Sequence, residues 1–193
     1  AGETKVETFV VFSADGTAHT ITITITGTND IPVIAGDDVG AVTEDATDPV
    51  LTDSGALTIT DADGGQAVFQ AGSGTPSAGA LGSLSIDTAG NWTYNVDNAD
   101  VQYLAAGETK VETFVVLSAD GTAHTVTITI TGTNDVPVIG RITNVIVSEE
   151  GLPLGLVDDV GNTDTTNTPS ATGTINIQDV DGDSLAVSLS GPA

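Results

Sequence analysis

The sequence predicts an all-β protein in which Greek-key β-sandwich domains follow one another in a linear array. Three observations indicate this fold. A long segment occurs twice almost unchanged, Thr and Ile alternate at a period of two, and Gly, Asp and Asn turns separate short β-branched runs. Alternation at a period of two is typical of a half-buried strand, and frequent turns between short strands are typical of sandwiches.

The repeated segment sets the size of the domain. Residues 1–34 return at residues 106–139 with three substitutions, which gives an internal period of 105 residues. A period of that length matches one small domain and is too long for a solenoid repeat. We therefore expect residues 29–134 to form a complete repeat, residues 1–28 to be the C-terminal strands of a preceding repeat, and residues 135–193 to be the N-terminal part of a following, divergent one.

Each copy of the repeated segment ends in a two-stranded ribbon. One strand alternates Thr with Ile, and the strand before it is rich in β-branched and aromatic residues. Asp-Gly, a favoured hairpin turn pair, joins the two strands. The first ribbon comprises Val6–Phe12, Asp15-Gly16 and Thr20–Thr26, and the second comprises Val111–Leu117, Asp120-Gly121 and Thr125–Thr131.

Further strands precede the ribbon in the complete unit. Gly55–Thr60, Ser83–Asp87 and Asn91–Val96 are short runs between turns, which brings the expected total to about seven strands. We expect Asn98–Ala106 to form one helical turn in a crossover between the two sheets. Trp92, the only tryptophan of the sequence, is expected in the core.

The last unit departs from the repeat after Ile139. Residues 57–63 find their counterparts at residues 175–181, an offset of 118 instead of 105, so this unit has thirteen additional residues. They fall within residues 140–172, where a polar stretch rich in Thr, Asn and Gly predicts a surface loop.

Composition restricts the class of partner. Twenty-seven Asp and Glu against three Lys and Arg give a formal net charge of −24. This charge argues against nucleic acid and anionic membranes, which would repel the chain, and favours cations as partners. With 39% hydrophobic residues the chain can still bury a core. The absence of Cys excludes disulfides, zinc-thiolate sites and a thiol nucleophile, and no apolar run reaches membrane-spanning length.

Three acidic clusters recur at fixed positions relative to the domain boundaries. They are the boundary motif TND-x-P, an acidic pair after the first strand, and a D-x-D after the second strand. A second strand that runs back returns its D-x-D to the pole where the chain enters, whereas the first strand delivers Glu44 to the opposite pole. One junction is therefore expected to gather Asn29, Asp30, Asp61 and Asp63, and the next Glu44, Asn134, Asp135, Asp179 and Asp181, with Asp183 as a further candidate.

Both predicted junctions consist of oxygen ligands alone. Six to eight hard oxygens, several of them from carboxylates, suit Ca²⁺, whereas Mg²⁺ prefers fewer protein ligands and keeps its waters. Calcium bound between domains would hold the linker rigid. We therefore predict calcium ions and the adjacent repeats of the same chain as partners, and no nucleic acid or membrane insertion.

The motifs GTND-x-PV, VTED, LTITDAD, GNWTYNVDN, LAAGET and SADGTAHTVTITITGTND resemble the VCBS repeats of large type I secreted RTX adhesins, which carry bacterial cells onto surfaces and into biofilms. The match spans residues 29–135, and the arrangement of acidic clusters is similar to that of Ig-like and cadherin-like repeats, which chelate calcium between successive domains. Residues 140–193 are similar chiefly through VSEEG and DVDGDS.

This resemblance implies a function and one further ligand. The chain would be a non-enzymatic extender, or stalk, repeat of an extracellular adhesin at the bacterial cell surface, rigidified by calcium. Glu108, in LAAGET, would correspond to the acidic residue that cadherins place before their penultimate strand, and would also bind calcium.

Other interpretations of these residues stay open. Asp and Asn populate turns, where they hydrogen-bond their own backbone, so the acidic clusters could be turns without metal. Ser118, Asp120 and His124, like Ser13, Asp15 and His19, are the residue types of a hydrolytic triad. They flank one tight hairpin without an oxyanion loop, so we expect no catalysis and imidazoles that face solvent.

Two other functions also stay open. A Thr-rich strand face or the loop at residues 158–170 could bind a glycan or a surface protein, although the few aromatic residues give sugar stacking little support. Alternatively, the chain could assemble head to tail with neighbouring chains, because residues 1–28 and residues 135–193 each supply only part of a domain.

Overall fold

The computed structural model describes residues 2–145, 172–182, 184–188 and 190. The chain separates into two compact units, Ala1–Thr133 and Asn134–Ala193. Strands dominate the described residues, whose helical structure is the short 3₁₀ helix η1 (Asn98–Asp100). The all-β prediction is therefore confirmed, and η1 begins where the sequence predicts a single helical turn.

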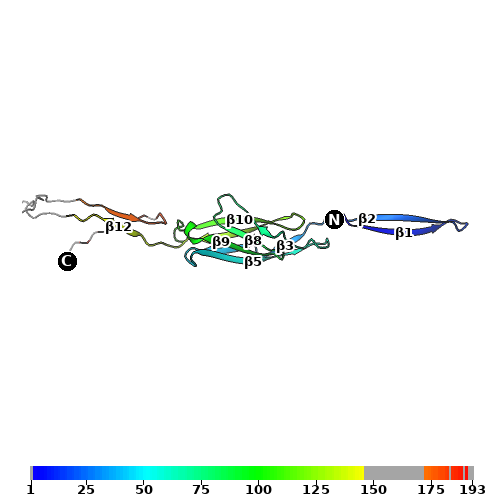
Figure 1. The fold of residues 1–193 in the computed structure, drawn as a ribbon, viewed down its shortest axis with the longest axis horizontal. Coiled ribbons are helices and arrows are strands. Elements are labelled where there is room, and N and C mark those ends of the chain that lie inside the picture. Colours follow the sequence, from blue (N-terminus) through cyan, green and yellow to red (C-terminus); the bar gives the residue numbers. More distant parts are fainter. Residues whose placement is uncertain (1, 146–171, 183, 189, 191–193) are drawn as a thin grey trace, which may run out of the picture. The chain divides into compact units, whose positions relative to one another are not determined.

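The first element is a hairpin of two strands, β1 (Thr4–Phe12) and β2 (Ala18–Thr26), which pair antiparallel with Phe9 opposite Ile21 (Figure 1). The loop between them is longer than a two-residue turn, because the backbone N–H of Ser13 donates to the carbonyl oxygen of Thr17 at 3.0 Å. Gly16 has a φ of 88° in this loop, a conformation that glycine adopts without strain.

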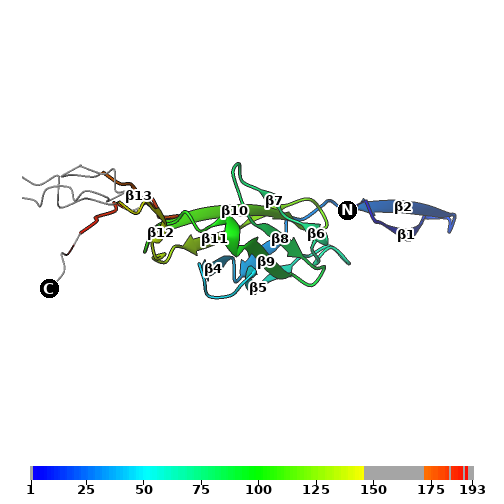
Figure 2. The same ribbon diagram turned by 60° about the vertical axis from the view of Figure 1, so that its left-hand side comes forward.

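Residues 33–131 form a β-sandwich. One layer is a five-stranded sheet in the order β3-β5-β9-β8-β6, and the other is a four-stranded sheet in the order β4-β11-β10-β7 (Figures 1 and 2). The bounds are β3 (Val33–Gly36), β4 (Val39–Thr43), β5 (Val50–Thr60), β6 (Gly72–Ser73), β7 (Thr75–Pro76), β8 (Ser83–Ile86), β9 (Asn91–Asp97), β10 (Thr109–Leu117) and β11 (Ala123–Thr131). The expected strands are present, and β6 and β7 are additional two-residue strands. As expected, η1 lies in the crossover from β9 to β10, which belong to different sheets.

The path of the chain gives the sandwich two distinct poles. β3 pairs antiparallel with β5, so that Val33 lies opposite Thr60. The chain then changes sheet, and β4 pairs parallel with β11, so that Thr43 lies opposite Thr131. The start of β3 and the end of β5 therefore share one end, the entry pole, and the ends of β4 and β11 share the other, the exit pole.

The core lies between the two sheets and follows the strand alternation. On β9, Trp92, Tyr94 and Val96 are buried while the residues between them are less so. The indole N–H of Trp92 donates to the carbonyl oxygen of Asp37 at 2.7 Å. The ring of Tyr94 meets that of Phe114 edge to face, with centroids 5.7 Å apart. The predicted core position of Trp92 is therefore confirmed.

Glu112 is a buried carboxylate that faces the core from β10, on the same face of the strand as Phe114. It accepts hydrogen bonds from the backbone N–H groups of Leu81 at 2.7 Å and Gly82 at 3.1 Å, and from the hydroxyl of Tyr94 at 2.9 Å. Burial and the contact with Glu112 raise the pKa of Tyr94, so its hydroxyl stays protonated and donates. The three donors offset the desolvation of the carboxylate and attach the segment before β8 to β10.

The strand β5 starts at Val50, five residues before the predicted start at Gly55. Asp53 and Ser54 disfavour a strand by propensity, and the tertiary structure overrides this preference. The Asp53 carboxylate accepts the backbone N–H of Ala41 on β4 at 2.6 Å, and so links the two sheets.

In the second unit, β12 (Val138–Ile142) and β13 (Ile175–Gln178) pair antiparallel. Ile139 lies opposite Ile177, as Ile34 lies opposite Ile59 in the first unit. At Val138 and Ile139 this ladder therefore repeats the β3–β5 ladder at the register expected from the offsets of 105 and 118 residues. A register shift follows, so that Ile175 lies opposite Ile142.

Candidate calcium centre

The first acidic cluster lies at the entry pole, where the segment before β3 meets the turn after β5. The backbone N–H of Asp30 donates to Oδ2 of Asp63 at 2.8 Å, and the backbone N–H of Asp63 donates to Oδ1 of Asp61 at 2.8 Å. The side-chain amide of Asn29 donates to the carbonyl oxygen of Asp30 at 2.7 Å. The β3–β5 ladder brings these four residues together, since it sets the start of one strand beside the end of the other.

The second unit contains a cluster with the same bonds. The backbone N–H of Asp135 donates to Oδ2 of Asp181 at 2.8 Å, and that of Asp181 donates to Oδ1 of Asp179 at 3.2 Å. The side-chain amide of Asn134 donates to the carbonyl oxygen of Asp135 at 2.7 Å. The arrangement is therefore a property of the motif and not of one sequence context.

Each cluster holds a buried carboxylate oxygen that the described residues leave without a hydrogen-bond partner. These atoms are Oδ2 of Asp61 in the first cluster and Oδ1 of Asp181 in the second. A buried carboxylate oxygen without a donor carries a desolvation cost that a bound cation would offset. The donor set therefore fits a hard cation such as Ca²⁺.

The number of side-chain ligands is small. Within the ranges that the structure describes, no three His, Cys, Asp or Glu side chains are grouped so that they could hold a metal ion. Ca²⁺ also accepts backbone carbonyl oxygens, amide oxygens and water, so a small number of grouped carboxylates does not exclude it.

Asp120 is a residue near the first cluster that the sequence reasoning did not assign to it. Its Oδ2 lies 3.2 Å from the side-chain nitrogen of Asn29, which donates to it. The hydroxyl of Ser118, together with the backbone N–H of Thr122, lowers the pKa of Asp120 from 3.8 to about 2. The signal in the sequence was the β10–β11 turn itself, because a strand that ends at the exit pole must begin near the entry pole.

Asp63 is also held in its ionised form. The hydrogen bond from the backbone N–H of Asp30 lowers the pKa of Asp63 below its usual value of 3.8. The carboxylates of Asp63 and Asp120 are therefore both charged at neutral pH, which makes the entry pole strongly anionic.

Glu44 lies at the exit pole. Its side chain is buried, and its Oε2 accepts the backbone N–H of Thr133 at 2.8 Å. The next residue, Asp45, has a φ of 60° and accepts hydrogen bonds from the side chains of Asn98 at 2.8 Å and Gln102 at 3.0 Å. The Asn98 hydrogen bond lowers the pKa of Asp45. Glu44 is thus bonded to the segment that leaves the sandwich, and Asp45 to the crossover between β9 and β10.

The remaining predicted ligands have different positions. Glu108 is exposed, and its carboxylate accepts the backbone N–H of Ala105 at 3.2 Å within its own turn. Asp183 and the loop at residues 158–170 lie outside the described residues.

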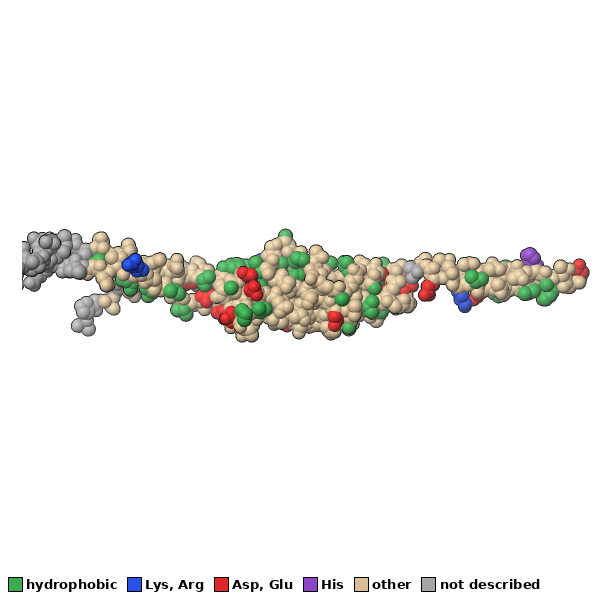
Figure 3. Space-filling model, viewed as in Figure 1, with side chains coloured by type: hydrophobic (Ala, Val, Ile, Leu, Met, Phe, Trp, Pro, Cys, Tyr) green, Lys and Arg blue, Asp and Glu red, His purple; other side chains and the backbone are tan. Residues whose placement is uncertain are grey.

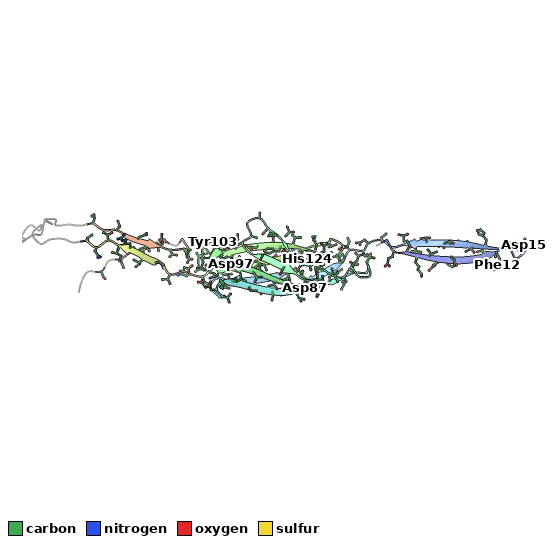
Figure 4. All side chains as sticks on the ribbon, in the orientation of Figure 1. Phe12, Asp15, Asp87, Asp97, Tyr103 and His124 are labelled. Atoms are coloured by element: carbon green, nitrogen blue, oxygen red, sulfur yellow. The ribbon has the colours of Figure 1, made fainter. Side chains whose placement is uncertain are left out.

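The residues of hydrolytic type form turns instead of a triad. The hydroxyl of Ser118 donates to Asp120, as that of Ser13 donates to Asp15 at the tip of the β1–β2 hairpin (Figure 4). The Nε2 atom of His124 lies 3.2 Å from Oδ2 of Asp38. His124 is therefore only partly exposed, because the crossover between β3 and β4 passes beside β11 and supplies a carboxylate, whereas His19 is exposed as expected.

No helix among the described residues is both long and apolar enough to cross a membrane.

Comparisons with known proteins assign the chain to a family. A search of curated proteins gave no match. The family model described as the bacterial cadherin-like domain matches residues 29–132, which is more than half of the chain. Domains of this kind are adhesion-type, extracellular and non-enzymatic repeats that commonly bind calcium, and the chain belongs to the bacterial cadherin-like domain family.

Proposed function

We propose that this chain is an extender repeat of a bacterial surface adhesin, in which calcium bound at the domain boundaries holds successive repeats in a rigid line. The observation that carries the proposal is the cluster of Asn29, Asp30, Asp61 and Asp63, which recurs with the same hydrogen bonds in the second unit. The buried oxygens of Asp61 and Asp181 support it independently.

The proposed ligands belong to two junctions. The first junction comprises Asn29, Asp30, Asp61 and Asp63, with Asp120 beside them. The second comprises Asn134, Asp135, Asp179 and Asp181, and Glu44, Glu108 and Asp183 are its further candidates. These are oxygen ligands throughout, so the proposed ion is Ca²⁺.

Hydrogen bonds within the chain order the first junction. The backbone N–H of Asp30 ties the linker to Asp63, and the Asn29 amide fixes the carbonyl of Asp30. Calcium, when bound, supplies the positive charge that offsets the repulsion between clustered carboxylates. Because it binds the ordered junction and not a disordered linker, it stabilises the ordered geometry by RT ln(1 + [Ca²⁺]/Kd).

The same observations support a proposal about the domain organisation and the kind of adhesin. We propose domains at residues 1–28, 29–134 and 135–193, with the first and last belonging to neighbouring repeats. Such an array suits a large type I secreted RTX adhesin that attaches bacterial cells to surfaces and supports biofilm formation. The acidic surface suits an environment rich in calcium, because cations then screen the net charge of −24.

Small-angle scattering tests the rigid linker. The chain would be measured in millimolar calcium and again in excess chelator, beside the double variant Asp61→Asn/Asp63→Asn and the control Asp97→Asn, which changes an exposed carboxylate at the end of β9, outside the first cluster. We expect calcium to increase the maximum dimension and narrow the distance distribution of the wild type and the control, and to do so less in the double variant, which keeps only the second junction. Identical curves with calcium and chelator would refute the calcium-dependent stalk.

A further inference from the structure

The strand β4 lies at an edge of the sandwich. It is the first strand of the four-stranded sheet, where it pairs with β11. The backbone N–H of Thr127 on β11 donates to the carbonyl oxygen of Asp38 at 2.8 Å. Alternate residues of a strand turn their backbone groups to opposite sides, so the even-numbered residues of β4 bond to β11. The backbone N–H of Ala41 therefore points away from β11, toward the edge.

A strand edge is a place where another chain can pair, because it presents backbone N–H and C=O groups to a second strand. The net charge of −24 opposes the association of two copies, and acidic side chains are visible on the surface of the sandwich in Figure 3. Backbone pairing needs no complementary side chains, however. A second copy of this chain always brings an identical edge, so the net charge alone does not prevent pairing.

Asp53 reaches this edge from the other sheet. It alternates on β5 with the buried Leu51 and Leu57, so its side chain is on the inner face of the strand. Its Oδ2 accepts the backbone N–H of Ala41 at 2.6 Å, and its Oδ1 accepts that of Ser54 at 2.8 Å. The carboxylate therefore takes the place that a carbonyl oxygen of a second strand would take.

Gly40 on β4 leaves room for this carboxylate. A Cβ at Gly40 would lie 2.8 Å from Oδ2 of Asp53 and 2.9 Å from the ring of Trp92. A side chain at this position would therefore displace Asp53 from Ala41. The glycine of one sheet and the carboxylate of the other are thus fitted to each other, independently of the hydrogen bond itself.

We propose that Asp53 closes the edge of β4 against pairing with a second copy of this chain. A second β4 would have to displace the carboxylate in order to reach the N–H of Ala41. Antiparallel pairing of two such edges about Ala41 would also bring two Asp53 carboxylates together, and their like charges repel. An inward-pointing charge beside an edge strand is one way in which sheet proteins avoid edge-to-edge aggregation. This inference does not depend on calcium binding.

The internal repeat makes a closed edge useful. Residues 1–34 and residues 106–139 differ at three positions, so one repeat presents strands that are similar to those of the next. Misassembly between similar domains is a characteristic failure of repeat proteins. On this proposal, Asp53 prevents one route to it, the pairing of two β4 edges.

Sedimentation velocity in chelator, from low to high micromolar concentration of the chain, tests the proposal. Asp53→Ala removes both the acceptor and the charge, and should lower the apparent Kd of self-association at least about tenfold relative to the wild type. Asp53→Asn, which is closest in shape, removes the charge and should also associate more strongly than the wild type. Trp92 fluorescence shows which variants keep the native core.

Asp87→Ala is the matched control. Asp87 also accepts backbone N–H groups, those of Ala89 and Asn91 at 2.9 Å, but it lies in the turn between β8 and β9. The same chemical change there should leave self-association as it is in the wild type.

The double variant Asp53→Ala/Ala41→Pro is the sharpest arm. Proline has no backbone N–H and is tolerated in edge strands, so it blocks pairing at the same position by different means. We expect it to restore the self-association of the wild type. Folded variants of Asp53 that associate no more than the wild type would overturn the proposal. Equal association of Asp53→Ala and the double variant would also overturn it, because another surface would then be responsible.

Discussion

The backbone N–H of Asp30 donates a hydrogen bond to Oδ2 of Asp63 at 2.8 Å, and thereby joins the segment before β3 to the turn after β5. Asp135 and Asp181 form the same bond at the same distance in the second unit. This bond needs only a backbone donor and a carboxylate. The linker is therefore held against its own domain by hydrogen bonds of the protein itself.

Removal of calcium should leave the core folded. Trp92, the only tryptophan, is 1% exposed and lies between the two sheets, so its fluorescence reports the core. We expect excess chelator to lower the melting temperature. At about room temperature (20–25 °C) it should leave the emission maximum of Trp92 unchanged. A red shift of Trp92 emission on chelation would contradict the separation of linker and core.

The buried carboxylate of Glu112 should contribute strongly to stability. Glu112→Ala leaves the hydroxyl of Tyr94 and two backbone N–H groups without an acceptor inside the protein, so we expect a loss of about 3 kcal/mol in the free energy of unfolding. Glu7→Ala changes the copy on the hairpin, where the side chain is accessible, and should cost less than about 0.5 kcal/mol. Urea unfolding monitored by Trp92 fluorescence measures both values. Equal losses would show that the two positions are not in different environments.

Gly82 should tolerate no side chain. A Cβ at this position would overlap the ring and hydroxyl of Tyr94, so Gly82→Ala would displace the tyrosine from Glu112. We expect a loss of at least about 2 kcal/mol in the same urea measurement. Gly64→Ala is the matched control, because a Cβ there meets open space, and it should change stability by no more than about 0.5 kcal/mol. A neutral Gly82→Ala would contradict the described packing of Tyr94.

The sequence predicted the sandwich because its periodic signals are local. The alternation of Thr and Ile in β11, together with the repeated ribbon, predicted the paired strands β10 and β11. Other features depend on partners distant in sequence. The segment VLTDSG contains no local signal that predicts the hydrogen bond from the N–H of Ala41 to Asp53 or the extension of β5. Asp120 likewise looks like an ordinary turn residue until the fold places it beside Asn29.

The sequence contains a signal that the carboxylate of Glu112 is buried. In the segment VETFVV the glutamate stands two residues before Phe114, which puts both side chains on the same face of a strand. A carboxylate on the apolar face indicates a buried polar group. Its partners could not be predicted, since they come from the loop before β8 and from β9.

Acid should weaken the sandwich through Asp120. Its pKa is lowered to about 2 in the folded chain, so the ionised carboxylate stabilises the folded state above about pH 4, and this contribution is lost as pH falls from about 4 to about 2. Asp120→Asn should be less stable than the wild type at pH 5, and the difference should shrink toward zero near pH 2. Urea midpoints measured across this range test the prediction, with Asp97→Asn as the control. A difference that stays constant with pH would contradict a role for the charge.

Calorimetric titration of calcium into the chelator-treated chain distinguishes calcium sites from metal-free turns. We expect saturable binding by the wild type, loss of part of the binding signal in Asp61→Asn, loss of a different part in Asp181→Asn, and no change in Asp97→Asn. An absence of saturable binding at millimolar calcium, or binding that both cluster variants retain in full, would contradict the proposal. The acidic clusters would then be metal-free turns and not calcium sites.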